Sequence, residues 1–251
     1  MEYRRSLLEV RDLHVEVEGK EVIRGLDLVL HRGEKLALMG PNGSGKSSLS
    51  MALMGHPGYK IKRGAIVLDG NDITGLSPDR RAKVGLFLAM QNPVVVQGLS
   101  VTNFLRAILK AKRGEEVPIR EFREMLVKAM SLLEMERSFA ARYVNDGFSG
   151  GEKKKLELLQ MTLLNPKVAV VDEIDSGLDV DALKIVAEGI NRVASEESAF
   201  LLITHYRRIL DYIRPDGVAV LMDGRIVASG GPELINQIDR QGYDWLAVKT
   251  A

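Results

Sequence analysis

Eight consecutive residues have the types and spacing of a phosphate-binding loop. Residues 40–47 read Gly-Pro-Asn-Gly-Ser-Gly-Lys-Ser, which is the full pattern of a glycine, four residues, and then glycine, lysine and serine. Glycines at positions 43 and 45 allow positive backbone angles, so that successive N–H groups form a concave anion site at a helix start. The pattern predicts that Lys46 reaches the β- and γ-phosphates of a nucleotide and that the Ser47 hydroxyl is a Mg²⁺ ligand.

The residues on either side predict the two elements that such a loop needs. Residues 35–39 indicate a short buried strand, and residues 48–54 indicate a helix. The alternative is a glycine-rich turn that binds no ligand, but the complete motif with the correct flanks favours the phosphate site. The predicted ATP-binding residues are Gly40, Asn42, Gly43, Ser44, Gly45, Lys46, Ser47 and Ser48.

Polar side chains follow three apolar runs that are predicted to be strands. Asp172 and Glu173 follow the run at 168–171, Gln91 follows 84–90, and His205 follows 199–204. Because parallel strands bring their carboxyl ends to one edge, these side chains are expected near the phosphates. We expect Asp172 to hold Mg²⁺ and Glu173 to act as general base.

Gln91 and His205 are weaker signals, because a lone glutamine or histidine at a strand end is more often structural. Their predicted position beside the phosphates suggests that Gln91 ligates Mg²⁺ or the attacking water and that His205 contacts the γ-phosphate. The predicted catalytic residues are therefore Glu173, His205 and Gln91, and the predicted metal ligands are Ser47, Gln91 and Asp172.

A second helix start also has the features of an anion site. Residues 148–152 read Phe-Ser-Gly-Gly-Glu, and Ser149 with Glu152 has the spacing of a capping box. The capping box does not account for Gly150 and Gly151. Their N–H groups are not covered by side chains at a helix N-terminus, and this favours binding of an anion. Two phosphate-binding helix starts in one chain suggest that the second serves another molecule's nucleotide.

The composition limits the other possibilities. The chain has 251 residues, a formal net charge of +1 and no cysteine. It therefore has no basic field for nucleic-acid binding, no disulfide and no thiolate nucleophile or ligand. No apolar run approaches the roughly 18–20 residues of a membrane span, so we expect a soluble, intracellular chain without direct membrane insertion.

The order of the patterns predicts an α/β fold with an insertion. Residues 7–30 alternate as antiparallel sheet around a turn at 18–20, and a hairpin is expected around Asp223 and Gly224. Residues 92–165 have helical periodicity without a strand-like run, which predicts an inserted helical subdomain. Buried strands alternating with helices in the remainder (1–91 and 166–251) predict a mainly parallel sheet within a single domain.

Together these motifs resemble the ABC-type ATPases over essentially the whole chain. The loop at 40–47, Gln91, residues 148–152, Asp172 with Glu173, residues 176–179 and His205 occur in that family's order. The resemblance implies a RecA-like core with an N-terminal antiparallel β subdomain and an α-helical subdomain. It also implies Mg²⁺-dependent ATP hydrolysis between two head-to-tail copies, with Ser149, Gly150 and Gly151 acting in trans on the other copy's ATP.

A narrower resemblance is to the SufC family of these ATPases, which serves the SUF system of iron–sulfur cluster assembly. It rests on residues 148–154, 158–161, 172–184, 204–206, 210–213 and 215–216 and on Gly242-Tyr243. Transporter ATPases more often have Pro-Thr or Pro-Phe where this chain has Asp175-Ser176. The resemblance implies a cytoplasmic ATPase that drives conformational change of a SufB or SufB-SufD type scaffold, with the partner surface around residues 93–104.

Two positions depart from the family pattern. The aromatic residue that usually stacks on adenine aligns with Val17, and Glu152 replaces a glutamine that many members carry. Lysines 153–155 are expected to compensate the charge of Glu152. A further hypothesis pairs these lysines with Glu173 in the resting monomer, although a solvated lysine face is the preferred interpretation.

Three functions remain in view. The absence of cysteine fits cluster assembly, because the ligands of a nascent cluster must then come from the partner. An ATPase subunit of an ABC membrane transporter is the alternative, and Asp175-Ser176 and Gly242-Tyr243 argue against it. A nucleotide-gated clamp without useful hydrolysis ranks last, because every catalytic position is filled.

Overall fold

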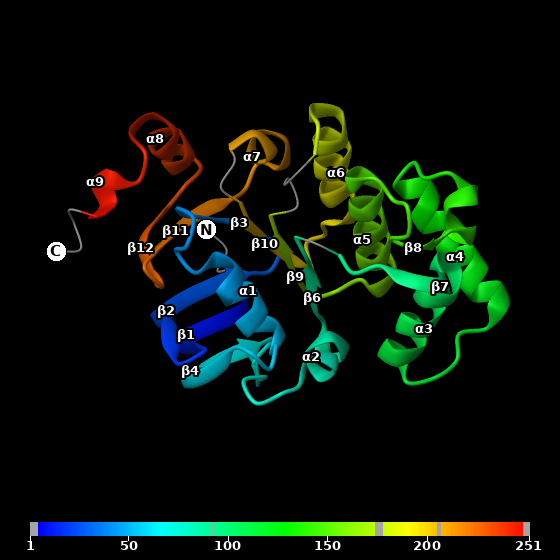
Figure 1. Ribbon diagram of the computed structural model, residues 1–251, viewed down its shortest axis with the longest axis horizontal. Coiled ribbons are helices and arrows are strands. Elements are labelled where there is room, and N and C mark those ends of the chain that lie inside the picture. Colours follow the sequence, from blue (N-terminus) through cyan, green and yellow to red (C-terminus); the bar gives the residue numbers. More distant parts are fainter. Residues whose placement is uncertain (1–4, 92, 174–177, 205–206, 248–251) are drawn as a thin grey trace.

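The first part of the chain forms a four-stranded antiparallel sheet. The computed structural model describes residues 5–91, 93–173, 178–204 and 207–247 (Figure 1). The strand order is β2-β1-β4-β5, with β1 (Ser6–Val17), β2 (Lys20–His31), β4 (Lys60–Leu68) and β5 (Asn71–Asp72). Glu18 and Gly19, both at positive φ, turn β1 into β2, which confirms the predicted antiparallel pair.

A six-stranded sheet forms the centre of the molecule. Its order is β12-β11-β3-β10-β9-β6, and all its pairs are parallel except β11 with β12. The strands are β3 (Lys35–Met39), β6 (Leu86–Ala89), β9 (Val168–Asp172), β10 (Ala199–Ile203), β11 (Gly217–Met222) and β12 (Arg225–Gly230). The mainly parallel α/β core is therefore confirmed, and so is the hairpin about Asp223 and Gly224.

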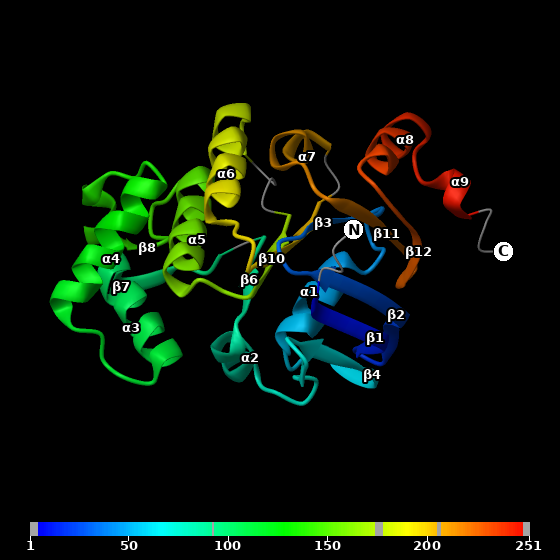
Figure 2. The same cartoon turned by 180° about the vertical axis from the view of Figure 1, so that it is seen from behind.

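Both faces of this sheet are covered, as expected for buried parallel strands. Alternate residues of each strand belong to different apolar clusters; in β9, for example, Val170 packs towards the antiparallel sheet and Val171 towards the other helices. On one side lies α1 (Lys46–Met54). On the other lie α5 (Gly150–Leu164), α6 (Val180–Val193), α7 (Arg207–Ile213) and α8 (Glu233–Gln241), with the short α9 (Asp244–Ala247) following (Figures 1 and 2).

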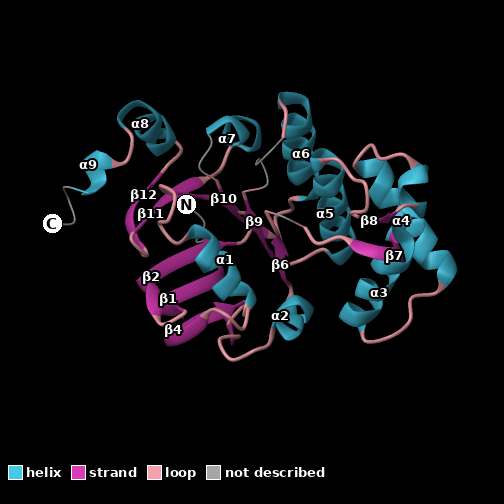
Figure 3. Cartoon of the chain, viewed as in Figure 1, coloured by secondary structure: helices cyan, strands magenta, loops and turns pink. Residues whose placement is uncertain are grey.

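The segment between β6 and β9 is mostly helical but contains a strand pair. Figure 3 shows α3 (Val101–Arg113), α4 (Ile119–Leu132) and α5 grouped at one end of the molecule, and the 3₁₀ turn η1 (Arg137–Ala141) follows α4 in the chain. Phe122, Leu126, Ala129 and Met130 are buried on one face of α4, which confirms the predicted helical periodicity in this segment. The expectation of no strand was wrong, because β7 (Val96–Ser100) pairs with β8 (Tyr143–Val144).

The β7–β8 pair was missed for a physical reason. It has only two registered residue pairs, Val96 with Val144 and Ser100 with Tyr143, and an irregularity separates them. A ribbon this short shows no period-two alternation.

A buried arginine ties α1 to the segment that follows the antiparallel sheet. Arg81, on α2 (Pro78–Val84), is 1% exposed. Its guanidinium donates to the carbonyl oxygens of Ala52 and Leu53 at the end of α1, at 2.8 and 2.6 Å, and to those of Thr74 and Leu76 at 2.6 and 2.9 Å. One side chain thus satisfies carbonyl groups at a helix C-terminus and in a loop.

Replacing Arg81 with methionine is expected to destabilise the fold. Four carbonyl groups, in two buried and two part-buried hydrogen bonds, would lose the guanidinium donor, which should lower the free energy of unfolding by about 3 kcal/mol. The melting temperature should fall by roughly 6–12 °C. Thermal unfolding of Arg81→Met beside Arg80→Met, a change at the exposed neighbour, measures this; equal melting temperatures would contradict it.

No helix within the described part of the chain is both long enough and apolar enough to span a bilayer.

Candidate functional site

The phosphate loop joins β3 to α1 at the carboxyl edge of the central sheet. Gly43 and Gly45 have φ angles of 80° and 107°, which confirms the positive backbone angles expected there. Gly40 approaches β11 so closely that an added Cβ would lie 2.1 Å from the carbonyl oxygen of Leu221. Glycine is therefore required at position 40 for close packing and at positions 43 and 45 for backbone conformation.

The side chain of Lys46 folds back across the loop. Its Nζ donates to the carbonyl oxygens of Gly40 and Pro41, at 2.9 and 3.0 Å. Burial lowers the pKa of Lys46, while the charges of Glu173 and Asp172 act in the opposite direction. The loop thus holds a cation close to two carboxylates.

A pocket of about 600 Å³ opens at the loop. This is within the roughly 300–1,000 Å³ of small-molecule and cofactor sites. Six of the eight predicted ATP-binding residues line it: Asn42, Gly43, Gly45, Lys46, Ser47 and Ser48. Gly40 and Ser44 are not among the lining residues; Ser44 is buried in the loop, and its N–H donates to the Pro41 carbonyl oxygen at 3.2 Å.

The far end of this pocket is formed by residues of β2 and the β11–β12 turn. Glu21, Val22 and Arg24 line it together with Asp223. Val17, which aligns with the aromatic residue that usually stacks on adenine, does not line the pocket, whereas the apolar residue Val22 does.

The two predicted oxygen ligands Ser47 and Asp172 face each other. Asp172 ends β9, and its Oδ1 lies 3.5 Å from Ser47 Oγ. Its Oδ2 accepts a 2.7 Å hydrogen bond from Ser50, whose side chain is fully buried. Burial raises the pKa of Asp172, and the Ser50 hydrogen bond opposes this shift. Ser50 was not predicted; its three-residue spacing from Ser47 on α1, which puts both on one face, was the available signal.

Gln91 and Glu173 also meet at this edge. β6 and β9 are parallel neighbours, and Gln91 Nε2 donates to Glu173 Oε2 at 2.8 Å. Glu173 has a φ of 44°, and its N–H donates to the carbonyl oxygen of Ile203 in β10. Parallel strands therefore bring Gln91 and Glu173 together, as predicted. His205, the third predicted catalytic residue, lies outside the residues that the structure describes.

The second helix start lies away from the pocket. Ser149 caps α5 by accepting a hydrogen bond from the Glu152 N–H at 3.2 Å, and Glu152 Oε2 accepts one from the Ser149 N–H at 2.8 Å. The predicted capping box is therefore confirmed. None of Ser149, Gly150 and Gly151 is among the pocket's lining residues, within the part of the chain that the structure describes. Ser176 and Gly177 fall outside that part.

The charge of Glu152 is balanced by an arginine rather than by the lysines that follow it. Arg142 Nη1 forms an ion pair with Glu152, and this hydrogen bond lowers the pKa of Glu152 most. The same guanidinium lies over the rings of Phe148 and Phe139, 4.2 and 5.6 Å from their centroids. Arg142 lies in a turn several residues before the motif at 148–152. No sequence periodicity therefore indicated its pairing with Glu152.

Replacing Arg142 with glutamine is expected to cost about 1 kcal/mol of unfolding free energy at pH 7. The folded-state pKa of Glu152 is lowered, so the ion pair contributes above the unfolded pKa and is lost as pH falls through the folded value. The difference in urea unfolding between Arg142→Gln and wild type should therefore be largest at pH 7 and shrink in acid, where only the contacts of the guanidinium with the Phe139 and Phe148 rings still distinguish the two. Arg137→Gln, at an exposed position of η1, is the control; a difference independent of pH would contradict the assignment.

Lys154 does not pair with Glu173 as hypothesised. It is buried, and its Nζ lies 3.0 Å from Glu157 Oε2 and 3.2 Å from the Gln91 carbonyl oxygen. Lys153 and Lys155 are partly exposed on α5. Because i and i+3 residues share a helix face, the Lys154–Glu157 spacing was visible in the sequence, but its burial was not.

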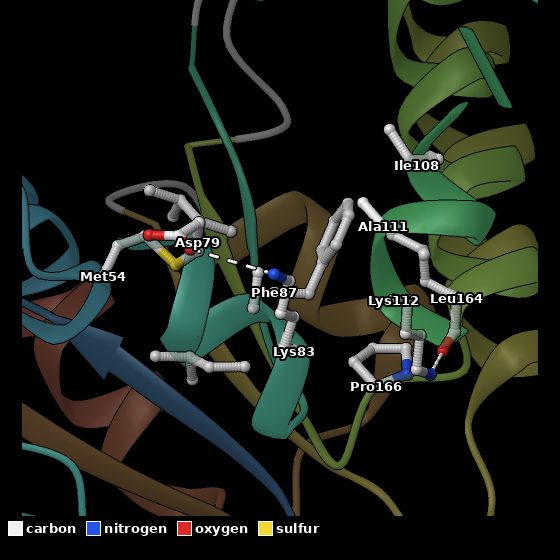
Figure 4. Close-up of a pocket in the computed structure, with 12 residues that line it drawn as sticks. Met54, Asp79, Lys83, Phe87, Ile108, Ala111, Lys112, Leu164 and Pro166 are labelled. Atoms are coloured by element: carbon white, nitrogen blue, oxygen red, sulfur yellow. Dashed lines mark hydrogen bonds and ion pairs between the residues drawn. The ribbon is translucent and has the colours of Figure 1, made fainter. Parts of the chain in front are cut away.

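A second, apolar pocket separates the core from the helical segment. It measures about 320 Å³ and lies between α2 and β6 on one side and α3 and the end of α5 on the other. Figure 4 shows Phe87 on one side, with Ile108 and Lys112 on the other. Lys112 Nζ contacts the carbonyl oxygens of Leu164 and Asn165 and so ties α3 to the end of α5.

The fold and the phosphate site together define a nucleotide-hydrolysing cassette, and comparison with known proteins agrees. A family model described as "ABC transporter" matches residues 23–176. A solved ATP-binding subunit of an ABC transporter superposes with a TM-score of 0.78 at 27% identity, covering 97% of this chain and 98% of that one. The chain belongs to the ABC ATPase family and is an ATPase.

The curated relatives place it more narrowly. Over 243 residues the chain is 51% identical to vegetative protein 296 of Bacillus subtilis (strain 168), covering 96% of this chain and 93% of that protein. It is 48% identical over 244 residues to the probable ATP-dependent transporter SufC of Escherichia coli (strain K12), covering 96% and 98%. Within the ABC ATPases, the chain belongs to the SufC family.

Proposed function

We propose that two copies of this chain close head to tail around ATP and thereby drive conformational change in a SufB or SufB-SufD type scaffold during cytoplasmic iron–sulfur cluster assembly. The observation that supports the dimer is the separation of two helix N-termini, those of α1 and α5. The pocket at α1 is lined by the phosphate loop and Glu173, whereas the exposed glycine at the start of α5 does not line it. A second copy would bring the missing half.

Each side chain of the pocket has a proposed role in the reaction. Lys46 binds the β- and γ-phosphates as a point charge, and the carbonyl groups of the loop hold its ammonium group in place beforehand. Glu173 takes the proton of the attacking water, and Gln91, which donates to its carboxylate, orients it. His205, which follows β10, is assigned to the γ-phosphate on its position in the sequence alone.

The residues at the end of β9 fit a magnesium ion. Ser47 Oγ and Asp172 Oδ1 are oxygen donors that face each other, and hard oxygen donors are those that Mg²⁺ prefers. The carboxylate is anchored through its other oxygen, so Oδ1 is the one directed to the site. Ser47, Asp172 and the amide oxygen of Gln91 would hold the ion, which would neutralise phosphate charge when bound.

The scaffold assignment rests on the SufC relatives and on the surface after Gln91. Val94 and Val95, which follow Gln91, are 69% and 44% exposed, and Tyr143 on the paired strand β8 is 51% exposed. Asn145, which follows β8, donates to the Val94 carbonyl oxygen at 2.7 Å and so holds the two segments together, and exposed apolar side chains on adjoining segments are typical of a protein contact. This surface lies within or beside residues 93–104, where the partner is expected.

Affinity purification tests the scaffold proposal. The intact chain should retain a soluble, cysteine-bearing protein, because this chain has no cysteine of its own to ligate a cluster. A Val94→Lys/Val95→Lys variant should lose that partner while keeping its own ATPase rate. Recovery of membrane permeases alone would overturn the proposal.

That last outcome would support the second candidate, an ATPase subunit of a membrane transporter. The observation in its favour is the name of the E. coli relative, which is described as a probable ATP-dependent transporter. The catalytic roles above would remain the same, and only the partner would change.

A further inference from the structure

We infer that Lys154 and Glu157 are positioning residues that fasten the backbone at Met90 and Gln91 to helix α5, so that Gln91 stays directed at Glu173. We call the two side chains and the backbone groups they bind the buried latch. None of the ATPase motifs contains Glu157, and the proposed scaffold role does not depend on it.

The latch consists of three contacts between α5 and the chain that follows β6, and of the ion pair within α5 that holds the two side chains together. Glu157 Oε1 accepts a 2.7 Å hydrogen bond from the Met90 N–H, and Glu157 Oε2 accepts one from Lys154 at 3.0 Å. Lys154 Nζ also donates to the carbonyl oxygens of Met90 and Gln91. Backbone groups on both sides of the Met90–Gln91 peptide bond are thus held by one ion pair.

Burial makes these contacts stronger than a surface pair would be. The Lys154 and Glu157 side chains are only 4% and 6% exposed. Breaking one member of a buried ion pair leaves an uncompensated charge, whereas neutralising both is often tolerated. Burial also raises the pKa of Glu157, and the neighbouring lysine opposes this shift. Two ionisable groups inside an otherwise apolar helix face therefore need a reason other than stability.

The position of the latch supplies that reason. It holds the backbone carbonyl of Gln91, whose side chain donates to Glu173 at 2.8 Å. Met90 is 40% exposed, and an exposed chain segment has little packing of its own to fix it. The latch replaces that packing with directed hydrogen bonds.

The latch also stands close to the other functional end of α5. Lys154 follows Ser149 by five residues, which is about 7.5 Å along a helix. A shift of the α5 N-terminus would therefore move Met90 and Gln91 with it, since the hydrogen bonds of Lys154 and Glu157 connect the helix to their backbone.

The double variant Lys154→Met/Glu157→Leu tests the inference, because it leaves neither a lone buried charge nor an acceptor for the Met90 N–H. The kcat for ATP should fall on the order of 10- to 100-fold, the scale expected when a catalytic group loses its position. The dissociation constant for ATP should change by less than about twofold, because no phosphate contact is altered. Exchange of the Met90 amide hydrogen should become at least about tenfold faster.

The matched control is Arg120→Met/Glu124→Leu, which removes an exposed ion pair on α4. It should change neither kcat nor exchange at Met90. The single variant Lys154→Arg, in which Glu157 is unchanged, keeps the charge and the donors. Its kcat should therefore lie above that of the double variant. An unaltered kcat, or a parallel loss of ATP binding, in the double variant would overturn the inference.

A measurement on the unchanged chain covers the case in which the double variant fails to fold. If the latch joins Met90 to α5, the Met90 amide should exchange as slowly as the buried amides of Leu158 and Leu159 on that helix. Exchange as fast as that of the exposed Val95 would refute the attachment.

Discussion

Replacing Glu173 with glutamine is expected to abolish ATP turnover while ATP still binds. Glutamine keeps the shape of the side chain and can accept the 2.8 Å hydrogen bond from Gln91, so the pocket should retain its geometry. It cannot take a proton from water. Loss of a general base typically costs roughly 10²- to 10⁴-fold in rate, and we expect kcat to fall by that factor.

Two measurements separate chemistry from binding in this variant. Equilibrium binding of ATP should remain within about threefold of wild type, because the contacts of Lys46 and the loop amides are unchanged. Glu197→Gln, at a side chain that is 82% exposed, is the control and should retain full turnover. Normal turnover by Glu173→Gln would refute the assignment of the base.

Lys46→Ala and Ser149→Arg are expected to inactivate the protein for different reasons. Lys46→Ala removes the loop's cation, and we expect ATP affinity to fall by at least about tenfold. Ser149→Arg fills the exposed start of α5 and should lower turnover on the order of 10²- to 10³-fold, the scale of a lost anion-stabilising donor, while ATP still binds.

Ser149→Arg also removes a helix cap, which has to be controlled. A lost cap costs about 1 kcal/mol of stability. Ser100→Arg also removes a serine cap, because the Ser100 side chain accepts a hydrogen bond from the Asn103 N–H at the start of α3, and it should leave turnover intact. Loss of ATP binding in Ser149→Arg would contradict the trans role of the α5 start.

The strands of the central sheet could be predicted from the sequence, because their apolar runs recur between helical segments. The strands at Lys35–Met39, Val168–Asp172 and Ala199–Ile203 are short apolar runs that alternate with helices, and this combination is typical of a parallel sheet covered on both faces. The β7–β8 pair could not be predicted, because its few residue pairs depend on where the surrounding helices place two distant segments.

The site was predictable where topology alone brings residues together. Gln91 and Glu173 end adjacent parallel strands, and this neighbourhood is sufficient for their contact. Arg142, Ser50 and the Lys154–Glu157 pair were not anticipated. The partner of a long charged side chain depends on burial and on loop geometry. A local sequence pattern predicts neither of these.

The most direct test of the account is to mix the two inactive variants, Lys46→Ala and Ser149→Arg. Each provides the half that the other lacks: a mixed dimer pairs the intact loop of one copy with the intact α5 start of the other. Random association would make half of the dimers mixed, each with one working site, so the mixture should regain about a quarter of wild-type turnover. A mixture as inactive as its components would show that the loop and the α5 start do not form one site across two copies.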